Sequence, residues 1–89
     1  MTNNEKDVRM FVETNCPSCK ALKNYLNSID IKFVECNIDN ADNKVDALML
    51  NIYSVPALVL GKEVLPAKEI FDSNNSLRKD KVTGFVRKE

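Results

Sequence analysis

A Cys-x-x-Cys motif at residues 16–19 stands where a short apolar run ends and a helical pattern begins. The run before it, residues 8–12, is rich in β-branched and aromatic side chains, which is typical of a strand. After the motif, Leu22, Leu26 and Ile29 recur at helical spacing, and Cys19 falls on the same stripe. The sequence therefore predicts a strand over residues 7–13 and a helix over residues 17–28, with the motif at their junction.

The position of the motif favours one reactive and one sheltered thiol. Cys16 is expected at the helix N-cap and Pro17 at the first helical position, where a missing N–H and a fixed φ cost nothing. Free N–H groups and the helix dipole would then favour the Cys16 thiolate. Cysteines in such a setting have pKa values of roughly 3.5–7.5 instead of about 8.5. Cys19 should face the core as a protonated thiol, and Ser18 could donate a hydrogen bond to sulfur or only keep the loop open.

The next segments predict a β-α-β unit. A second strand is expected over residues 31–38 and is followed by helix N-cap candidates at residues 39–42. The two strands should pair in parallel through a right-handed crossover, with the first strand central in the sheet. The expected inner stripe of the second helix is Val45, Leu48, Met49 and Ile52, and Val34, Cys36 and Ile38 should share a strand face.

The remaining third of the chain predicts a hairpin and two helices. Residues 54–60 form an apolar run with Pro56 at its leading edge, a position where a strand tolerates proline. Gly61-Lys62 is a turn signal, and residues 63–65 would return as a fourth strand. Pro66 is expected to start a short helix that runs through Phe71, and an amphipathic helix is expected over residues 79–88.

Length and composition limit the choice of function. With 89 residues, we expect a single domain over 1–89, with a frayed lead-in at 1–6 and a C-terminal helix within 77–89 packed on the sheet. Thirteen basic and thirteen acidic residues give no net charge, which argues against nucleic acid as a partner. No apolar stretch has the length of a signal peptide or a membrane span, so we expect a cytoplasmic monomer without a membrane partner. Three cysteines are too few for a secreted disulfide scaffold.

This order of elements, β-α-β-α-β-β-α, resembles the thioredoxin superfamily. The resemblance rests on the Cys-x-x-Cys motif at the first strand-to-helix junction and on Ser54-Val55-Pro56 at the third strand, and it covers about residues 7–71. Length and motif look closest to small glutaredoxin-like proteins. The resemblance implies an α/β thioredoxin fold, a four-stranded mixed sheet flanked by helices. It also implies a cis peptide bond before Pro56, next to the sulfurs, and a Val55 backbone that pairs with the extended chain of a substrate.

The activity that the resemblance implies is dithiol–disulfide exchange. The Cys16 thiolate would attack a disulfide of a protein or small molecule, and Cys19 would then attack Cys16 to release the reduced substrate. Such a protein requires no metal and no organic cofactor. The expected site residues are the catalytic pair Cys16 and Cys19, the active-site loop Pro17 and Ser18, and the substrate-binding edge Val55 and Pro56.

Three departures from the glutaredoxin pattern bear on the electron donor and on proton transfer. Glutaredoxins that bind glutathione usually carry a lysine at the position of Glu13, which binds a glutathione carboxylate. They also usually carry a Gly-Gly-x-Asp motif at the position of residues 65–68, which read Leu-Pro-Ala-Lys here. We therefore expect a donor such as a thioredoxin-reductase type enzyme, or another low-potential donor, rather than glutathione. Met10 replaces the buried acid of thioredoxins, so proton transfer at Cys19 would use water or a less obvious group.

Two other functions are compatible with the motif. Two thiolates can hold Cu(I) in a metal carrier, although such carriers follow the first helix with a hairpin instead of a second β-α pair. The second function is that of a redox-sensing module, which exchanges electrons with one partner without turnover. A structural zinc site would need four ligands, and the chain has three cysteines and no histidine. Cys36 is interpreted as a small buried hydrophobe.

Overall fold

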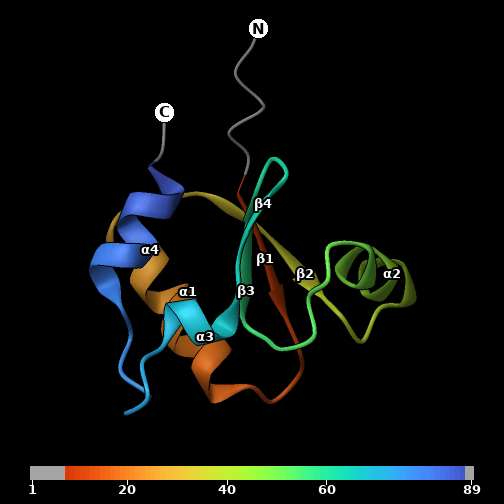
Figure 1. Cartoon of the computed structure of the whole chain (residues 1–89), viewed down its shortest axis with the longest axis horizontal. Helices are drawn as coiled ribbons and strands as arrows, with labels where there is room; N and C mark the ends of the chain where they lie inside the picture. The colour runs from red at the N-terminus through yellow and green to blue at the C-terminus, as the bar shows by residue number, and fades with distance from the viewer. Residues whose placement is uncertain (1–7, 88–89) are drawn as a thin grey trace, which may run out of the picture.

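A four-stranded mixed sheet forms the centre of the molecule. The structure, a computed structural model, describes residues 8–87, so the lead-in predicted for residues 1–6 lies outside the described residues. The strands are β1 (Val8–Val12), β2 (Phe33–Asn37), β3 (Ala57–Leu60) and β4 (Glu63–Leu65), in the order β2-β1-β3-β4 (Figure 1). β1 pairs in parallel with β2 and antiparallel with β3, and β3 pairs antiparallel with β4. The predicted mixed sheet with a central first strand is confirmed.

Helices cover both faces of this sheet. Helices α1 (Pro17–Ser28), α3 (Ala67–Ile70) and α4 (Lys79–Val86) gather on one side, and α2 (Ala41–Met49) lies on the other (Figure 1). The alternation of side chains along β1 feeds both layers, because Met10 packs with α1 and α4 whereas Phe11 packs with α2. The strand is therefore buried on both faces, as predicted.

The end of α1 explains how the chain turns back into β2. Asp30 adopts a positive φ of 62°, its N–H donates to Asn27 O at 3.1 Å, and the Ile31 N–H donates to Leu26 O at 3.0 Å. This pair of hydrogen bonds is a Schellman motif, which satisfies the last carbonyls of a helix. Both α1 boundaries agree with the prediction. The last helix ends at Val86 with Arg87 as its C-cap, before the predicted end at residue 88, which lies outside the described residues.

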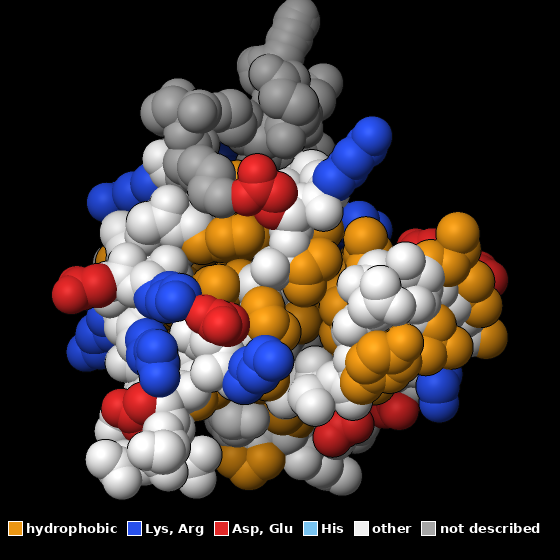
Figure 2. Space-filling view, viewed as in Figure 1, with side chains coloured by type: hydrophobic (Ala, Val, Ile, Leu, Met, Phe, Trp, Pro, Cys, Tyr) orange, Lys and Arg blue, Asp and Glu red, His pale blue; other side chains and the backbone are white. Residues whose placement is uncertain are grey.

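The inner stripe predicted for the second helix is wrong. Val45, Leu48 and Met49 are 54%, 50% and 78% exposed, and the buried residue of α2 is Ala47. Figure 2 shows the resulting hydrophobic surface over α2. Ile52 is buried as predicted, but it lies beyond the helix.

The C-terminus of α2 supplies the physical reason. The Ile52 N–H donates to Ala47 O at 2.8 Å and the Asn51 N–H donates to Leu48 O at 3.0 Å, which is a second Schellman motif. Ile52 and Ala47 pack together against the sheet, so this cap turns the Ala47 face inward and leaves the face of Leu48 outside. On the edge strand β2, Val34 is likewise 55% exposed while Cys36, on the same face, is buried.

Large apolar side chains are buried in α1 and exposed in α2, so truncating one in each helix should change the free energy of unfolding by different amounts. Leu22→Ala removes a side chain that is 0% exposed in α1, and we expect it to lower the free energy of unfolding by about 2–5 kcal/mol. Met49→Ala removes an exposed side chain from α2 and should change it by less than about 0.5 kcal/mol. Urea unfolding followed by circular dichroism measures both. Equal losses for the two variants would contradict the described packing.

Candidate active site

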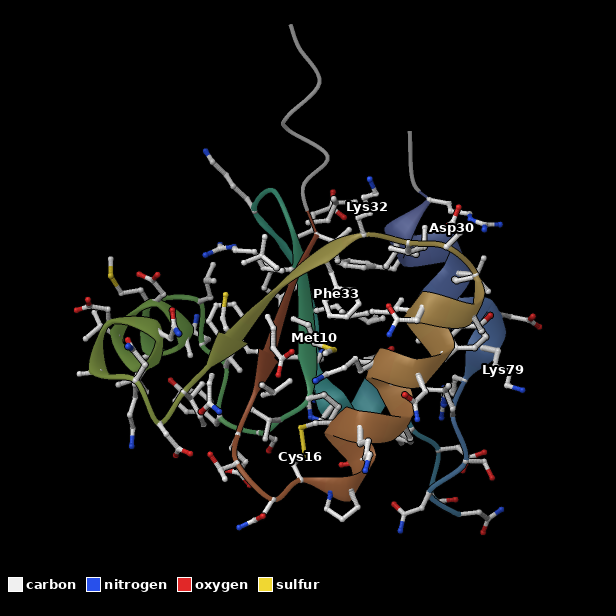
Figure 3. The ribbon with its side chains drawn as sticks, turned by 180° about the vertical axis from the view of Figure 1, so that it is seen from behind. Met10, Cys16, Asp30, Lys32, Phe33 and Lys79 are labelled. Carbon is white, nitrogen blue, oxygen red and sulfur yellow. A yellow bond between two sulfur atoms is a disulfide. The ribbon has the colours of Figure 1, made fainter. Side chains whose placement is uncertain are left out.

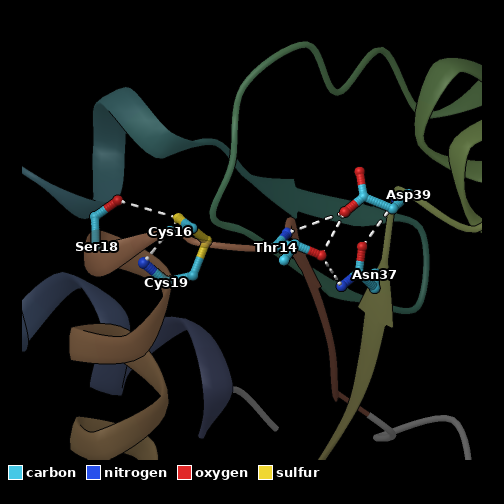
Figure 4. Close-up of a disulfide and its surroundings, with 6 residues drawn as sticks. All are labelled: Thr14, Cys16, Ser18, Cys19, Asn37 and Asp39. Atoms are coloured by element: carbon cyan, nitrogen blue, oxygen red, sulfur yellow. Dashed lines mark hydrogen bonds between the residues drawn. A yellow bond between two sulfur atoms is a disulfide. The ribbon is translucent and has the colours of Figure 1, made fainter.

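The two cysteines of the motif are joined at the start of α1. Cys16 is the N-cap, with extended backbone at φ −116° and ψ 100°, and Pro17 occupies the first helical position. The Cys19 N–H donates to Cys16 Sγ at 3.1 Å, so a helix N-terminal donor points at this sulfur. A disulfide links Cys16 and Cys19, whose Cα atoms are 5.2 Å apart (Figure 4). Cys19 is 4% exposed, in agreement with its predicted sheltered position, and Cys16 is half-buried.

Ser18 lies close to the outer sulfur. Its Oγ is 3.5 Å from Cys16 Sγ, and because a disulfide sulfur has no hydrogen, the serine hydroxyl is the donor here (Figure 4). Of the two roles that the sequence left open for Ser18, a hydrogen bond to sulfur is therefore geometrically available. The hydroxyl adds a second donor to the one supplied by the Cys19 N–H.

The loop that carries Cys16 is tied to the end of β2. Thr14 donates its hydroxyl and its backbone N–H to Asp39 Oδ2, and Asn37 Nδ2 donates to Thr14 Oγ1 at 3.4 Å (Figure 4). The Thr14 hydroxyl, and then its backbone N–H, lower the pKa of the Asp39 carboxyl below its ordinary value. From the sequence, Asp39 was only a helix N-cap candidate, whereas the N-cap of α2 is Asn40. These bonds fix the loop that leads into the disulfide.

The predicted loop and edge residues share one groove of about 670 Å³. Pro17 and Ser18 line it from α1, and Val55 and Pro56 line it from the approach to β3. The Val55–Pro56 peptide bond is cis, as the resemblance implied, and Pro56 is fully buried. The other lining residues come from α1, α3 and the segment after α3, and they are Ala21, Ala67, Lys68, Phe71, Asp72 and Asn75.

Two charged side chains, Asp72 and Lys68, line this groove. Asp72 accepts the backbone N–H groups of Asn74 at 2.8 Å and Ser76 at 2.9 Å. The bond from Ser76 and then that from Asn74 lower the pKa of the Asp72 carboxyl. This carboxylate is therefore engaged in shaping its own loop. Lys68 brings a positive charge to the same groove.

A second cavity, of about 340 Å³, borders the disulfide, whereas neither cysteine lines the first groove. Both cysteines line it, together with Glu13, which follows β1, and Glu35 of β2. Lys23 Nζ lies 2.9 Å from Glu35 Oε1. Lys20 and Lys23 of α1 also line this cavity. Glu35 could not be identified from the sequence, because only the pairing of β2 with β1 brings it to the cavity that the cysteines line.

Cys36 belongs to a different part of the core. It is 7% exposed and packs with Phe11 and Ala47 on the α2 face of the sheet, whereas Cys19 packs on the opposite face. Burial raises the pKa of the Cys36 thiol, and the nearby Arg9 only partly opposes this effect. Its burial on the far face supports the interpretation as a small hydrophobe.

Neither a metal cluster nor a membrane span occurs in the described part of the chain. Within residues 8–87, no three His, Cys, Asp or Glu side chains come together in a way that could hold a metal ion. None of the helices described is both long enough and apolar enough to cross a membrane.

Solved structures of a glutaredoxin and of a thioredoxin-like protein have the same fold as this chain. A glutaredoxin from Archaeoglobus fulgidus is 20% identical, with a TM-score of 0.67, and the match covers 98% of this chain and 97% of that chain. The thioredoxin-like protein BC3987 is 21% identical with a TM-score of 0.61, and the match covers 68% of this chain and 86% of that chain. A point mutant of BC3987 gives 22% identity and a TM-score of 0.65, with 68% and 85% covered. These similarities show a shared thioredoxin-like fold.

Sequence comparison gives the family. No curated protein matches this chain at a significant level. The family model described as Glutaredoxin matches residues 8–65, which is more than half of the chain and includes the disulfide and the cis proline. The chain therefore belongs to the glutaredoxin family.

Proposed function

We propose that this protein is a dithiol–disulfide oxidoreductase that reduces disulfides of proteins or small molecules. The observation that carries the proposal is the position of the Cys16–Cys19 disulfide at the start of α1, where the adjoining Pro17 and Ser18 share a groove with Val55 and Pro56. Helix N-termini favour thiolates, which are the nucleophiles of disulfide exchange. The groove gives an extended substrate chain room to bind next to the N-terminus of α1, where Cys16 is half-buried.

The reaction has two exchange steps. In the reduced protein, the Cys16 thiolate attacks one sulfur of the substrate disulfide, and the other sulfur leaves as a thiolate that takes a proton from solvent. Cys19 then loses its proton and attacks Cys16, which forms the Cys16–Cys19 disulfide and releases the second substrate thiolate. The substrate has gained two electrons, so a donor must reduce the disulfide before the next cycle.

Val55 and Pro56 are proposed as the docking edge for the substrate. Both line the groove together with Pro17 and Ser18 of α1. Proline has no N–H, so nothing at position 56 competes with the Val55 backbone for an extended partner chain. Pairing of that kind provides main-chain hydrogen bonds without a strict sequence requirement.

The electron donor is proposed to be a thioredoxin-reductase type enzyme or another low-potential donor, as found in a reducing cytoplasm. Glutathione is a small thiol with a carboxylate at each end. Glu13 lines the cavity beside both cysteines, where its negative charge would repel such a carboxylate. In the groove, Lys68 is accompanied by Asp72, so the positive charge there is offset.

A coupled assay tests the activity and the donor together. The substrates are insulin and hydroxyethyl disulfide, and the donors are NADPH with thioredoxin reductase, or NADPH with glutathione reductase and glutathione. We expect faster NADPH oxidation with thioredoxin reductase, and Glu13→Lys should raise the rate with glutathione. A faster rate with glutathione for the unmodified protein would overturn the proposed donor. If neither donor supports turnover, the proposed enzymatic activity is wrong and a redox-sensing module is favoured instead.

A further inference from the structure

An ion pair between α1 and β2 lines the same cavity as the two cysteines of the redox pair. Glu35 Oε1 is 2.9 Å from Lys23 Nζ, and both residues line the 340 Å³ cavity together with Cys16 and Cys19. Both side chains are partly exposed, at 43% for Glu35 and 38% for Lys23. The cavity therefore connects a carboxylate with the two sulfurs and with solvent.

Strand register and helix spacing place this pair. Glu35 is directly opposite Met10 of β1, so its side chain leaves the sheet on the same face as Met10, toward α1. Figure 3 shows Met10 on this side of the sheet, with Cys16 at the N-terminus of α1. Lys23 lies four residues after Cys19, on the same face of α1. The register thus brings Glu35 to the helix face that carries Cys19.

The second exchange step creates a need for a proton acceptor at this place. Cys19 is 4% exposed, and its thiol must lose a proton before it attacks Cys16. The titratable groups that line the cavity besides the cysteines are Glu13, Lys20, Lys23 and Glu35. Lysine ammonium groups cannot accept a proton, so the candidates are Glu13 and Glu35. Glu13 lies on an exposed loop, whereas Lys23 holds the Glu35 carboxylate on the sheet.

We propose that Glu35 accepts the proton of Cys19 when Cys19 attacks the mixed disulfide, through water in the cavity, and that Lys23 positions its carboxylate. The inference rests on the proposed function and names the base of its second step. The Cys19 S–H bond breaks, its proton passes to the carboxylate, and the sulfur electron pair forms the bond to Cys16. The bond between Cys16 and the substrate sulfur breaks, and the substrate leaves as a thiolate. Glu35 afterwards returns the proton to solvent.

The test separates the two steps. The probe is an alkyl disulfide with a fluorophore on each half, arranged so that the intact molecule is quenched. When Cys16 attacks, one half leaves and the other stays bound to Cys16, so the quenching ends and the fluorescence intensity rises. When Cys19 then attacks, the bound half is released from the protein and the fluorescence anisotropy falls. All variants carry Cys36→Ala, so that the third thiol cannot contribute. The variants are Glu35→Gln, Glu35→Asp and, as the other carboxylate of the cavity, Glu13→Gln.

We expect Glu35→Gln to leave the first step unchanged and to slow the second at neutral pH by about 100-fold, the low end of what general base catalysis contributes. The loss should shrink as pH rises, because hydroxide can then remove the proton, and Glu35→Asp should recover part of the rate. Glu13→Gln should behave as the parent protein. An unchanged second step in Glu35→Gln, or an equal loss in Glu13→Gln, would overturn the inference. If the parent protein shows no first step, the proposed function fails instead.

A second control addresses the ion pair as a structural element. Glu69 Oε1 and Lys81 Nζ form a comparable pair at 2.7 Å, away from the cavity. Partly exposed pairs contribute little to stability, so Glu69→Gln and Glu35→Gln should unfold at similar urea concentrations. Only Glu35→Gln should slow the release of the second half of the probe. A similar slowing in Glu69→Gln would mean that the loss of an ion pair, not of a base, is responsible.

Discussion

Replacing Cys16 with serine is expected to abolish disulfide reduction by this protein. A serine hydroxyl is not ionised at neutral pH and does not form a disulfide with the substrate, so the first exchange step has no nucleophile. The fold should survive the change. Serine is among the preferred N-cap residues, and Cys16 already accepts the Cys19 N–H in that position. The reductase-coupled assay with insulin measures the activity, and circular dichroism measures the helix content.

The matched control for this variant is Cys36→Ala. Cys36 is buried on the α2 face, apart from the disulfide, so its removal should leave turnover close to that of the unmodified protein. Full activity in Cys16→Ser would show that another group performs the attack. A loss of activity in Cys36→Ala at unchanged helix content would show that the third thiol takes part in the reaction.

Removing the second cysteine is expected to trap the substrate instead of preventing its attack. In Cys19→Ser, the Cys16 thiolate can still open a disulfide, but no neighbouring thiol remains to release the product. Each protein molecule should therefore release one thiol equivalent and stay joined to the other half of the substrate. Mass spectrometry without reductant should find the added mass on the peptide that contains Cys16.

Because Cys19 is 4% exposed, serine also brings a hydroxyl into the core, at a cost of about 1–3 kcal/mol if the hydroxyl is left unpaired. Cys19→Ala avoids this cost and should trap the same adduct. The double variant Cys16→Ser with Cys19→Ala should form none. An adduct on Cys36, or turnover by Cys19→Ala at the parent rate, would contradict the assigned order of attack.

The elements around the motif could be predicted from sequence because their signals are local. Pro17 at a helix start and the spacing of Leu22 and Leu26 determine α1, and the alternation of Met10 and Phe11 marks a strand buried on both faces. The orientation of α2 could not be predicted in this way. Helical periodicity identifies residues that share a face, but the face that turns inward depends on the contact of Ile52 with Ala47 after the chain has reversed.

The same distinction applies to the site. The positions of Cys16, Cys19, Val55 and Pro56 could be predicted because they belong to motifs with fixed spacing. The bonds from Thr14 to Asp39, and the approach of Glu35 to the cysteines, link residues more than fifteen positions apart. They depend on the register between β1 and β2, which pairs Met10 with Glu35 and which no local pattern specifies.

The start of α1 is expected to make Cys16 more nucleophilic than an ordinary cysteine, and the rate of thiol alkylation measures this property. The protein is Cys19→Ala with Cys36→Ala, which leaves Cys16 as its one thiol. The rate of reaction with iodoacetamide is measured against pH, in the folded state and again in urea. We expect the folded protein to reach its half-maximal rate at a lower pH than the unfolded protein, because only the folded helix stabilises the thiolate. A half-maximal rate at the same or a higher pH in the folded state would contradict it.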